Sequence, residues 1–412
     1  MSRTAFILSL PMALFISGAA MQAQVPTLPA LGIPDGFGVN IHFTHAGPDE
    51  LRTLGESGAR FIRMDFSWGR VERTKGEYDF TAYDGLVADM AKLGIRCLFI
   101  LDYSNRLYDD NLGPHTDEGR AAFARFAGAA AKHFSGKGIL WEIWNEPNIG
   151  QFWKPKPNAD DYSALALATI AAVRQADPNA FIMGPASSTF PWDFFELMGQ
   201  RGVFAKLDAV SVHPYRRTGP ESVEADYARL RALVERYAPG RNIPIVSGEW
   251  GYTTVEISEE QQADYLVRQR LVNLSLQVPV SIWYDWKEDG SDPKEREHHF
   301  GMVYPDLKPK PSYIAGKALA ETLAGYRFVR RVASESPDDY VLRFRNAAGQ
   351  IADAAWTTAE AHSIKIDATG DLTVVSRDGQ RRSAHSQGAM EIQLSASPQY
   401  ILFGAPAALG KK

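Results

Sequence analysis

Short apolar segments alternate with longer segments of helical period from about residue 37 to residue 324, and this alternation restricts the possible folds most. The predicted strands are 37–43, 59–66, 95–101, 138–144, 181–185, 207–213, 243–248 and 279–285. The predicted helices are 48–57, 81–93, 117–134, 159–176, 192–200, 221–237, 258–277 and 311–323. These units predict a (β/α)8 TIM barrel, an α/β fold, over residues 30–324, with a doubly wound open sheet as the alternative.

The pattern changes after residue 325 to short segments in which apolar and polar residues alternate between Gly-containing turns. Such segments predict strands with one buried face, and we expect a small C-terminal β-sandwich domain over 325–406. Trp356 is the only tryptophan in it, so a structural role is favoured over carbohydrate binding.

The first residues have the pattern of a secretory signal peptide. Arg3 precedes an apolar run that Pro11 interrupts, and small residues follow it up to about residue 23. We therefore expect cleavage of residues 1–23, export to the periplasm or the medium, and no membrane span in the mature protein, with an uncleaved N-terminal anchor as the alternative. The single cysteine, Cys97, lies in a predicted strand and is expected to be a core residue.

Composition argues against nucleic acid as a partner and favours a carbohydrate. The formal net charge is −5, so the chain lacks the broad basic surface that nucleic acid requires. Aromatic residues make up 11 % of the chain, including nine tryptophans. Their flat apolar faces suit the binding of sugar rings.

Polar and aromatic residues gather where the predicted barrel strands end. Reacting groups of TIM barrels come from this end of the strands, so these residues are candidates for the site. The set comprises His42, Arg63, Asn145, Glu146, His213, Tyr215, Glu249 and Trp283.

Glu146 and Glu249 end the fourth and seventh predicted strands and form the natural pair of carboxyl groups. Retaining cleavage of a glycosidic bond needs one carboxylic acid to protonate the leaving oxygen and one carboxylate to attack the anomeric carbon. Either residue alone would be interpreted as an ordinary ion-paired glutamate. Glu142 lies about 13 Å before Glu146 along the strand, at about 3.3 Å per residue, and we expect it in a buried ion pair.

Three motifs resemble the signatures of the retaining β-glycosidases of clan A. They are Trp-Glu-Ile-Trp-Asn-Glu-Pro-Asn at 141–148, His-Pro-Tyr at 213–215 and Ser-Gly-Glu-Trp at 247–250. Arg-Met-Asp at 63–65, the segment 68–80 and the C-terminal β-domain make the chain most similar to glycoside hydrolase family 39. The cellulase-like enzymes of family 5 share much of this pattern.

The resemblance implies a role for each residue of the set. Glu146 would be the general acid/base and Glu249 the nucleophile of a double displacement that cleaves O-glycosidic bonds, β-linked by analogy, in an oligo- or polysaccharide. The substrate-binding residues would be Asn145 at the sugar 2-hydroxyl, Arg63 and Tyr215 beside Glu249, His213 near the acid/base, and Trp283 as the stacking floor. His42 is a further substrate-binding candidate from its position at the end of the first strand.

Two alternatives remain open at this stage. His42 and His45 could suggest a metal-dependent hydrolase, but residues three apart on a strand face opposite sides. A carbohydrate-binding pseudoenzyme would keep the tryptophans and lose a catalytic glutamate. We predict an enzyme without metal or cofactor. The charged loop 287–300 is expected to be a solvated loop, with a rim that contacts substrate as the alternative.

Overall fold

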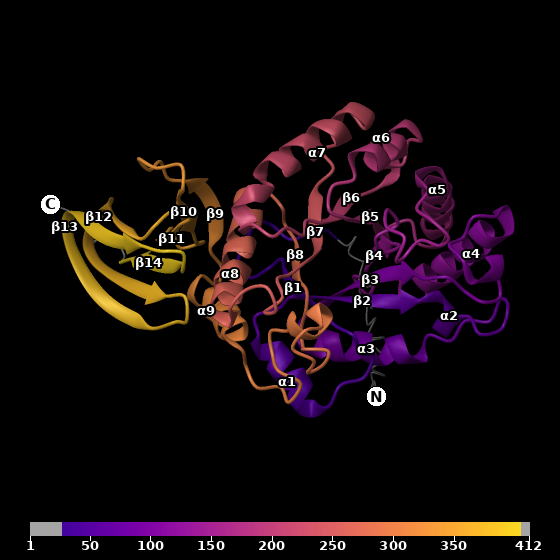
Figure 1. Ribbon diagram of the computed structural model, residues 1–412, viewed down its shortest axis with the longest axis horizontal. Helices are drawn as coiled ribbons and strands as arrows, with labels where there is room; N and C mark the ends of the chain where they lie inside the picture. The colour runs from indigo at the N-terminus through magenta and orange to yellow at the C-terminus, as the bar shows by residue number, and fades with distance from the viewer. Residues whose placement is uncertain (1–26, 405–412) are drawn as a thin grey trace, which may run out of the picture.

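The computed structural model describes residues 27–404 and consists of a barrel and a β-domain (Figure 1). The predicted signal peptide lies outside the described residues, as do the last two residues of the predicted β-domain. No helix in the described part of the chain has the length and apolar character needed to span a bilayer.

Eight parallel strands close the barrel in chain order, with β1 hydrogen-bonded to both β2 and β8. The predicted TIM barrel is therefore confirmed, and the open sheet is excluded. The strands are β1 (Phe37–Asn40), β2 (Phe61–Ser67), β3 (Arg96–Asp102), β4 (Leu140–Ile143), β5 (Phe181–Ser188), β6 (Ala209–His213), β7 (Ile245–Trp250) and β8 (Ser281–Trp283).

Helices follow the strands and cover the outside of the barrel. Each predicted helix is present within three residues of its predicted bounds. They are α1 (Pro48–Glu56), α3 (Thr81–Lys92), α4 (Asp117–His133), α5 (Ala159–Ala176), α6 (Trp192–Gln200), α7 (Glu224–Tyr237), α8 (Glu259–Ser275) and α9 (Pro311–Thr322), with a short α2 (Trp68–Val71) after β2. Thr116, Asn158 and Ser258 cap α4, α5 and α8 through side-chain oxygens, as short polar N-cap residues do.

The barrel interior is apolar near the start of the strands. Phe61, Leu98, Leu140, Val246 and Ile282 belong to one buried cluster there, together with Met183, Ala209 and Val280. Side chains of a strand alternate between its two faces, so the residues two and four positions later point inward as well. This alternation places the second half of each strand around a common site.

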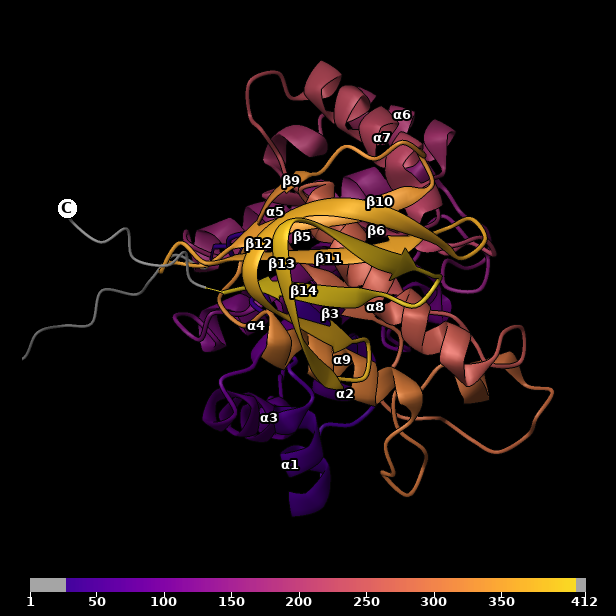
Figure 2. The ribbon, with the colours of Figure 1, turned by 90° about the vertical axis from the view of Figure 1, so that its left-hand side faces the viewer.

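The C-terminal region is one antiparallel sheet of six strands, which confirms the predicted β-domain. The strand order is β13-β12-β14-β11-β10-β9. The strands are β9 (Arg327–Arg331), β10 (Asp339–Arg345), β11 (Ile351–Thr357), β12 (His362–Ser376), β13 (Arg381–Leu394) and β14 (Gln399–Phe403). Figure 2 shows the strong curvature of the β12-β13 hairpin. Through it, Ile366 and Ile392 share a core with Val341 and Ile401, so one curved sheet supplies both layers of the predicted sandwich.

The other face of this sheet packs against the barrel through α8 and α9 (Figure 1). Trp356 of β11 is fully buried and its Nε1 donates to Glu221 at 2.8 Å. Arg268 of α8 donates to both oxygens of Glu221 at 2.7 and 2.8 Å. Arg377 donates to Asp264 of α8 at 2.7 Å. Apolar packing and ion pairs therefore fix the two parts together.

Candidate active site

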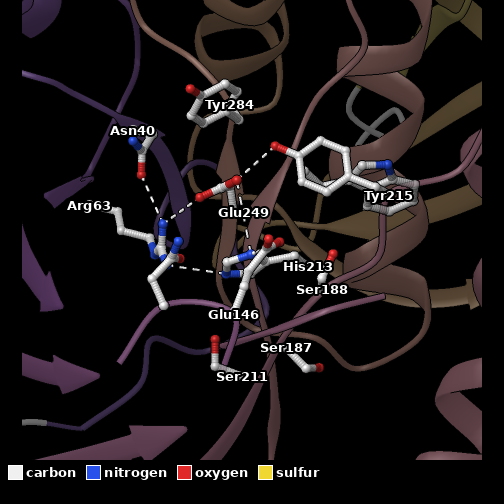
Figure 3. A network of polar contacts seen from close by, with 12 residues as sticks. Asn40, Arg63, Glu146, Ser187, Ser188, Ser211, His213, Tyr215, Glu249 and Tyr284 are labelled. Atoms are coloured by element: carbon white, nitrogen blue, oxygen red, sulfur yellow. Dashed lines mark hydrogen bonds and ion pairs between the residues drawn. The ribbon is translucent and has the colours of Figure 1, made fainter. Parts of the chain in front are cut away.

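The Arg63 guanidinium is the centre of a polar network at the C-terminal ends of the barrel strands (Figure 3). It is 1 % exposed, and a buried charge requires partners for all its donors. Its five N–H groups have five acceptors: Nε donates to Glu142 (2.7 Å), Nη1 to Asn40 (3.1 Å) and Glu249 (2.6 Å), and Nη2 to Asn145 (2.8 Å) and His213 Nε2 (3.2 Å).

Glu142 is fully buried and belongs to the layer below the site, as its position in β4 predicted. Arg63 and the Ser211 hydroxyl donate to its two oxygens, which confirms the expected buried ion pair. A side chain at Gly248 would place Cβ 2.9 Å from the Glu142 carboxylate, so only glycine leaves room for this contact. Glu142 thereby fixes the orientation of Arg63 beneath Glu249.

Glu249 is the second-last residue of β7 and is held at both carboxylate oxygens. Arg63 donates to Oε2, and the Tyr215 hydroxyl donates to Oε1 at 2.9 Å. Burial and the charge of Glu249 hold the pKa of Tyr215 well above its ordinary value, so this phenol keeps its proton and remains a donor. Two donors stabilise the charged form of the carboxylate, as a nucleophile requires.

Glu146 follows β4 in a loop of unusual backbone conformation. Trp144 and Glu146 have φ angles of 65° and 45°, in the left-handed region that side chains rarely adopt. The Glu146 amide donates to Ala186 of the neighbouring strand end at 2.9 Å, which supports this turn. The strain directs the Glu146 side chain toward Glu249.

His213 contacts Glu146 through Nδ1, which lies 2.9 Å from Glu146 Oε1. Arg63 donates to the other ring nitrogen, Nε2, so Nε2 is an acceptor and carries no proton. The ring proton is therefore on Nδ1. His213 therefore donates to Oε1 and leaves Oε2 of Glu146 available to a substrate. A carboxylate oxygen of Glu146 and one of Glu249 lie within 4.8 Å of each other.

Asn145 lies between the two glutamates in sequence and in space, and is 6 % exposed. Its Oδ1 accepts from Arg63 at 2.8 Å, so its amide nitrogen is left to donate to a ligand. The structure thus brings Arg63, Asn145, Glu146, His213, Tyr215 and Glu249 of the predicted set together.

Trp283 is the exception, and its predicted role as the stacking floor is wrong. The ring is 1 % exposed and its Nε1 donates to the Phe300 carbonyl at 3.3 Å. Ile282 faces the barrel interior, so Trp283 faces outward and Tyr284 faces inward again. Figure 3 shows Tyr284 and Tyr215 on two sides of Glu249. Tyr284, which packs edge-on against Phe300, is the aromatic wall of the site.

His42 lies at the rim, where Asp285 and Asp289 of the loop after β8 surround it. Burial opposes its protonation, but the hydrogen bond to Asp289 and the charge of Asp285 raise the pKa of His42 to about 9. Nδ1 of His42 faces Asp289 Oδ1 at 3.3 Å, and the Asn40 amide lies 3.1 Å from Nε2. Asp285 and Asp289 therefore favour the protonated form of His42 at the rim of the site.

Asp65 and Asp102 form a carboxyl pair beside Arg63. Asp102 is fully buried, and burial followed by the charge of Asp65 raises the pKa of Asp102 well above the ordinary value. Burial therefore favours the protonated form of Asp102.

The loop 287–300 reaches the rim, which agrees with the alternative that its sequence left open and not with a purely solvated loop. Glu297 accepts from the Tyr284 hydroxyl at 3.4 Å. Lys287 is paired instead with Glu50 of α1 at 2.8 Å, and Arg296 with Glu256 at 2.9 Å. The loop therefore presents Glu297 to the site, while Lys287 and Arg296 pair with carboxylates of other segments.

The comparisons with known proteins agree with this arrangement. The family model for cellulases, glycosyl hydrolase family 5, matches residues 36–289. The chain belongs to this family. The matched segment covers the barrel from β1 to the loop after β8, and it contains both Glu146 and Glu249.

A structure of a family 39 glycoside hydrolase from Bacteroides cellulosilyticus WH2 is similar over 92 % of this chain and 83 % of that one, with a TM-score of 0.79 and 25 % identity. A family 39 β-xylosidase from Caulobacter crescentus shares the fold over 92 % of this chain and 98 % of that one, with a TM-score of 0.69 and 19 % identity. The predicted resemblance to families 39 and 5 is confirmed.

A β-xylosidase from Geobacillus stearothermophilus is 29 % identical over 204 residues. The match covers 43 % of this chain and 40 % of that protein, so the chain spans less than half the length of this curated relative.

Proposed function

We propose that this protein is a retaining glycoside hydrolase in which Glu249 is the nucleophile and Glu146 the general acid/base. The observation that carries the proposal is the approach of the two carboxylates to within 4.8 Å. Retaining enzymes hold these groups about 5–5.5 Å apart, whereas inverting enzymes need about 6.5–9.5 Å to admit water between them.

The reaction divides between the two residues according to their contacts. Glu249, held at both oxygens by Arg63 and Tyr215, attacks the anomeric carbon while Glu146 transfers a proton from Oε2 to the glycosidic oxygen. The bond to the leaving group breaks and a glycosyl-enzyme forms on Glu249. Glu146, now a carboxylate, then takes a proton from water, which attacks the same carbon and releases the sugar.

We propose substrate contacts for residues whose polar atoms are not all used in hydrogen bonds within the protein. The amide nitrogen of Asn145 points to the sugar 2-hydroxyl, where hydrogen bonds strengthen in the transition state. His42 and Asp289 lie at the rim and contact hydroxyl groups of the sugar bound there. Arg63 and His213 act through the glutamates they contact.

We propose a β-linked oligo- or polysaccharide as substrate, with β-xylosides tested first because a relative is named a β-xylosidase. We also propose export, on the apolar run and small residues at the N-terminus. Sequencing the N-terminus of protein from its native host should find the chain starting near residue 24, and an intact Met1 would overturn that part.

Variants of the two glutamates test the mechanism. Glu249→Gln should lower turnover of every substrate by about 10⁴-fold or more, because no covalent intermediate forms. Glu146→Ala should still form the glycosyl-enzyme from activated aryl glycosides, because their leaving groups need no proton. Added azide should attack this intermediate, restore turnover and give a glycosyl azide. Glu118→Gln, on the exposed side of α4, is the matched control and should behave as wild type. Normal activity of Glu249→Gln would refute the assignment.

A further inference from the structure

Arg270 of α8 is buried without any hydrogen-bond partner. It is 1 % exposed, and its Nε, Nη1 and Nη2 atoms contact no acceptor among residues 27–404. Two other buried arginines behave differently, because Arg63 uses all five donors and Arg268 forms a double ion pair with Glu221. Unpaired buried groups are rare in folded proteins, and each one indicates a missing partner.

The surroundings of Arg270 offer donors and apolar groups. Its guanidinium carbon lies 4.7 Å from the centroid of the Phe37 ring at the start of β1, a cation–π contact. A Cβ atom on Gly316 of α9 would lie 3.0 Å from Nη1, so glycine makes room for the guanidinium. Tyr400 of β14 is fully buried, and its hydroxyl also lacks a partner in the described part of the chain.

Charge limits what the missing partner can be. Burial lowers the pKa of Arg270 to about 10, so the side chain is still charged at neutral pH. Tyr400 is the one ionisable group whose charge affects it, and burial keeps that phenol protonated. No carboxylate among the described residues therefore balances the charge. A water molecule would satisfy N–H and O–H donors but would leave the charge unpaired, at a large cost in free energy.

We propose that a small monovalent anion of chloride size binds between α8, α9 and β14, where the N–H groups of Arg270 and the hydroxyl of Tyr400 donate to it. Arg270 belongs to the barrel and Tyr400 to the β-domain, so the anion stabilises the contact between the two. This site is separate from the two glutamates and does not depend on the proposed enzymatic activity.

Thermal unfolding of the full chain tests the proposal in solution. Replacing sodium gluconate by sodium chloride at equal ionic strength should raise the unfolding midpoint by about 3 °C in a saturable way. Arg270→Met should lose this shift. Lys317→Met removes a partly exposed cation of α9 and should retain it. An equal shift in wild type and Arg270→Met would overturn the proposal.

Crystals of the wild-type protein grown in bromide provide a test that does not depend on a variant. Bromide scatters anomalously, and we expect an anomalous peak within about 3.5 Å of the Arg270 guanidinium, at the distance of a charge-assisted hydrogen bond. Water alone beside Arg270 at saturating bromide would overturn the proposal.

Discussion

At the N-terminal end of the barrel the inward-facing side chains of β2 and β4 are Phe61 and Leu140, whereas two residues later they are Arg63 and Glu142. The same strands and the same alternation therefore supply an apolar plug at one end and a charged network at the other. The plug stabilises the fold through buried apolar area. The network buries charged groups, and its hydrogen bonds hold Glu249 in place.

The largest effect that distinguishes the two ends is expected from Arg63→Met. The substitution leaves Glu142 and Glu249 without their shared cation, so we expect kcat/KM to fall by about 10³-fold or more and the free energy of unfolding to fall by about 3–5 kcal/mol. Kinetics on an aryl glycoside and chemical denaturation measure both. Retention of activity within about tenfold would show that Arg63 does not orient the nucleophile.

A change at the opposite end should affect stability alone. Leu98→Ala removes a fully buried side chain of the apolar plug, and we expect a loss of about 2–5 kcal/mol in the free energy of unfolding. Well below the unfolding temperature, kcat should stay within about twofold of wild type. A drop in kcat as large as that of Arg63→Met would mean that the two ends are not functionally distinct.

Two neighbouring aromatic residues at the end of β8 and directly after it sharpen the comparison on a smaller scale. Tyr284→Ala removes the aromatic wall beside Glu249 and should lower kcat/KM by about 10–100-fold, mainly through KM. Trp283→Phe removes part of a buried ring outside the barrel and should lower the unfolding midpoint with little change in KM. The reverse pattern would restore Trp283 as the stacking residue.

The smallest effect concerns the pH dependence of stability. Unfolded wild-type chain releases the Asp102 proton above about pH 4, whereas burial and Asp65 keep it bound in the folded protein. Wild-type stability therefore falls as pH rises above about 4, by at most about 1.4 kcal/mol per pH unit from this group. Asp102→Asn has no such proton, so its stability relative to wild type should increase with pH. Chemical denaturation of both proteins at several pH values measures this difference. If the free energy of unfolding changed with pH by the same amount in both proteins, the raised pKa of Asp102 would be contradicted.

Sequence patterns predicted the barrel well because apolar alternation and helical period are local signals. The bounds of α5 and α6 agree with the prediction at both ends. Motif positions also identified the pair Glu146 and Glu249 that the structure brings together, although their catalytic roles remain a proposal. The sequence did not predict that the β-domain is a single curved sheet, because strand order depends on long-range pairing.

The errors and omissions in the site have physical causes. Trp283 was chosen for its residue type, but counting alternate positions from Ile282 would have selected Tyr284. Asn40 was missed, although the same alternation from the glycine at 38 places it inward. The left-handed backbone at Glu146 had no signal in the sequence, because a tertiary contact with Ala186 supports it.

The most direct test of the central claim is the anomeric configuration of the first product. Proton NMR of a β-glycoside substrate in the first minutes of hydrolysis, before mutarotation, should show the β-anomer of the released sugar. Two displacements at one carbon, first by Glu249 and then by water activated by Glu146, require this result. Initial formation of the α-anomer would contradict the double displacement and the role of Glu249 as nucleophile.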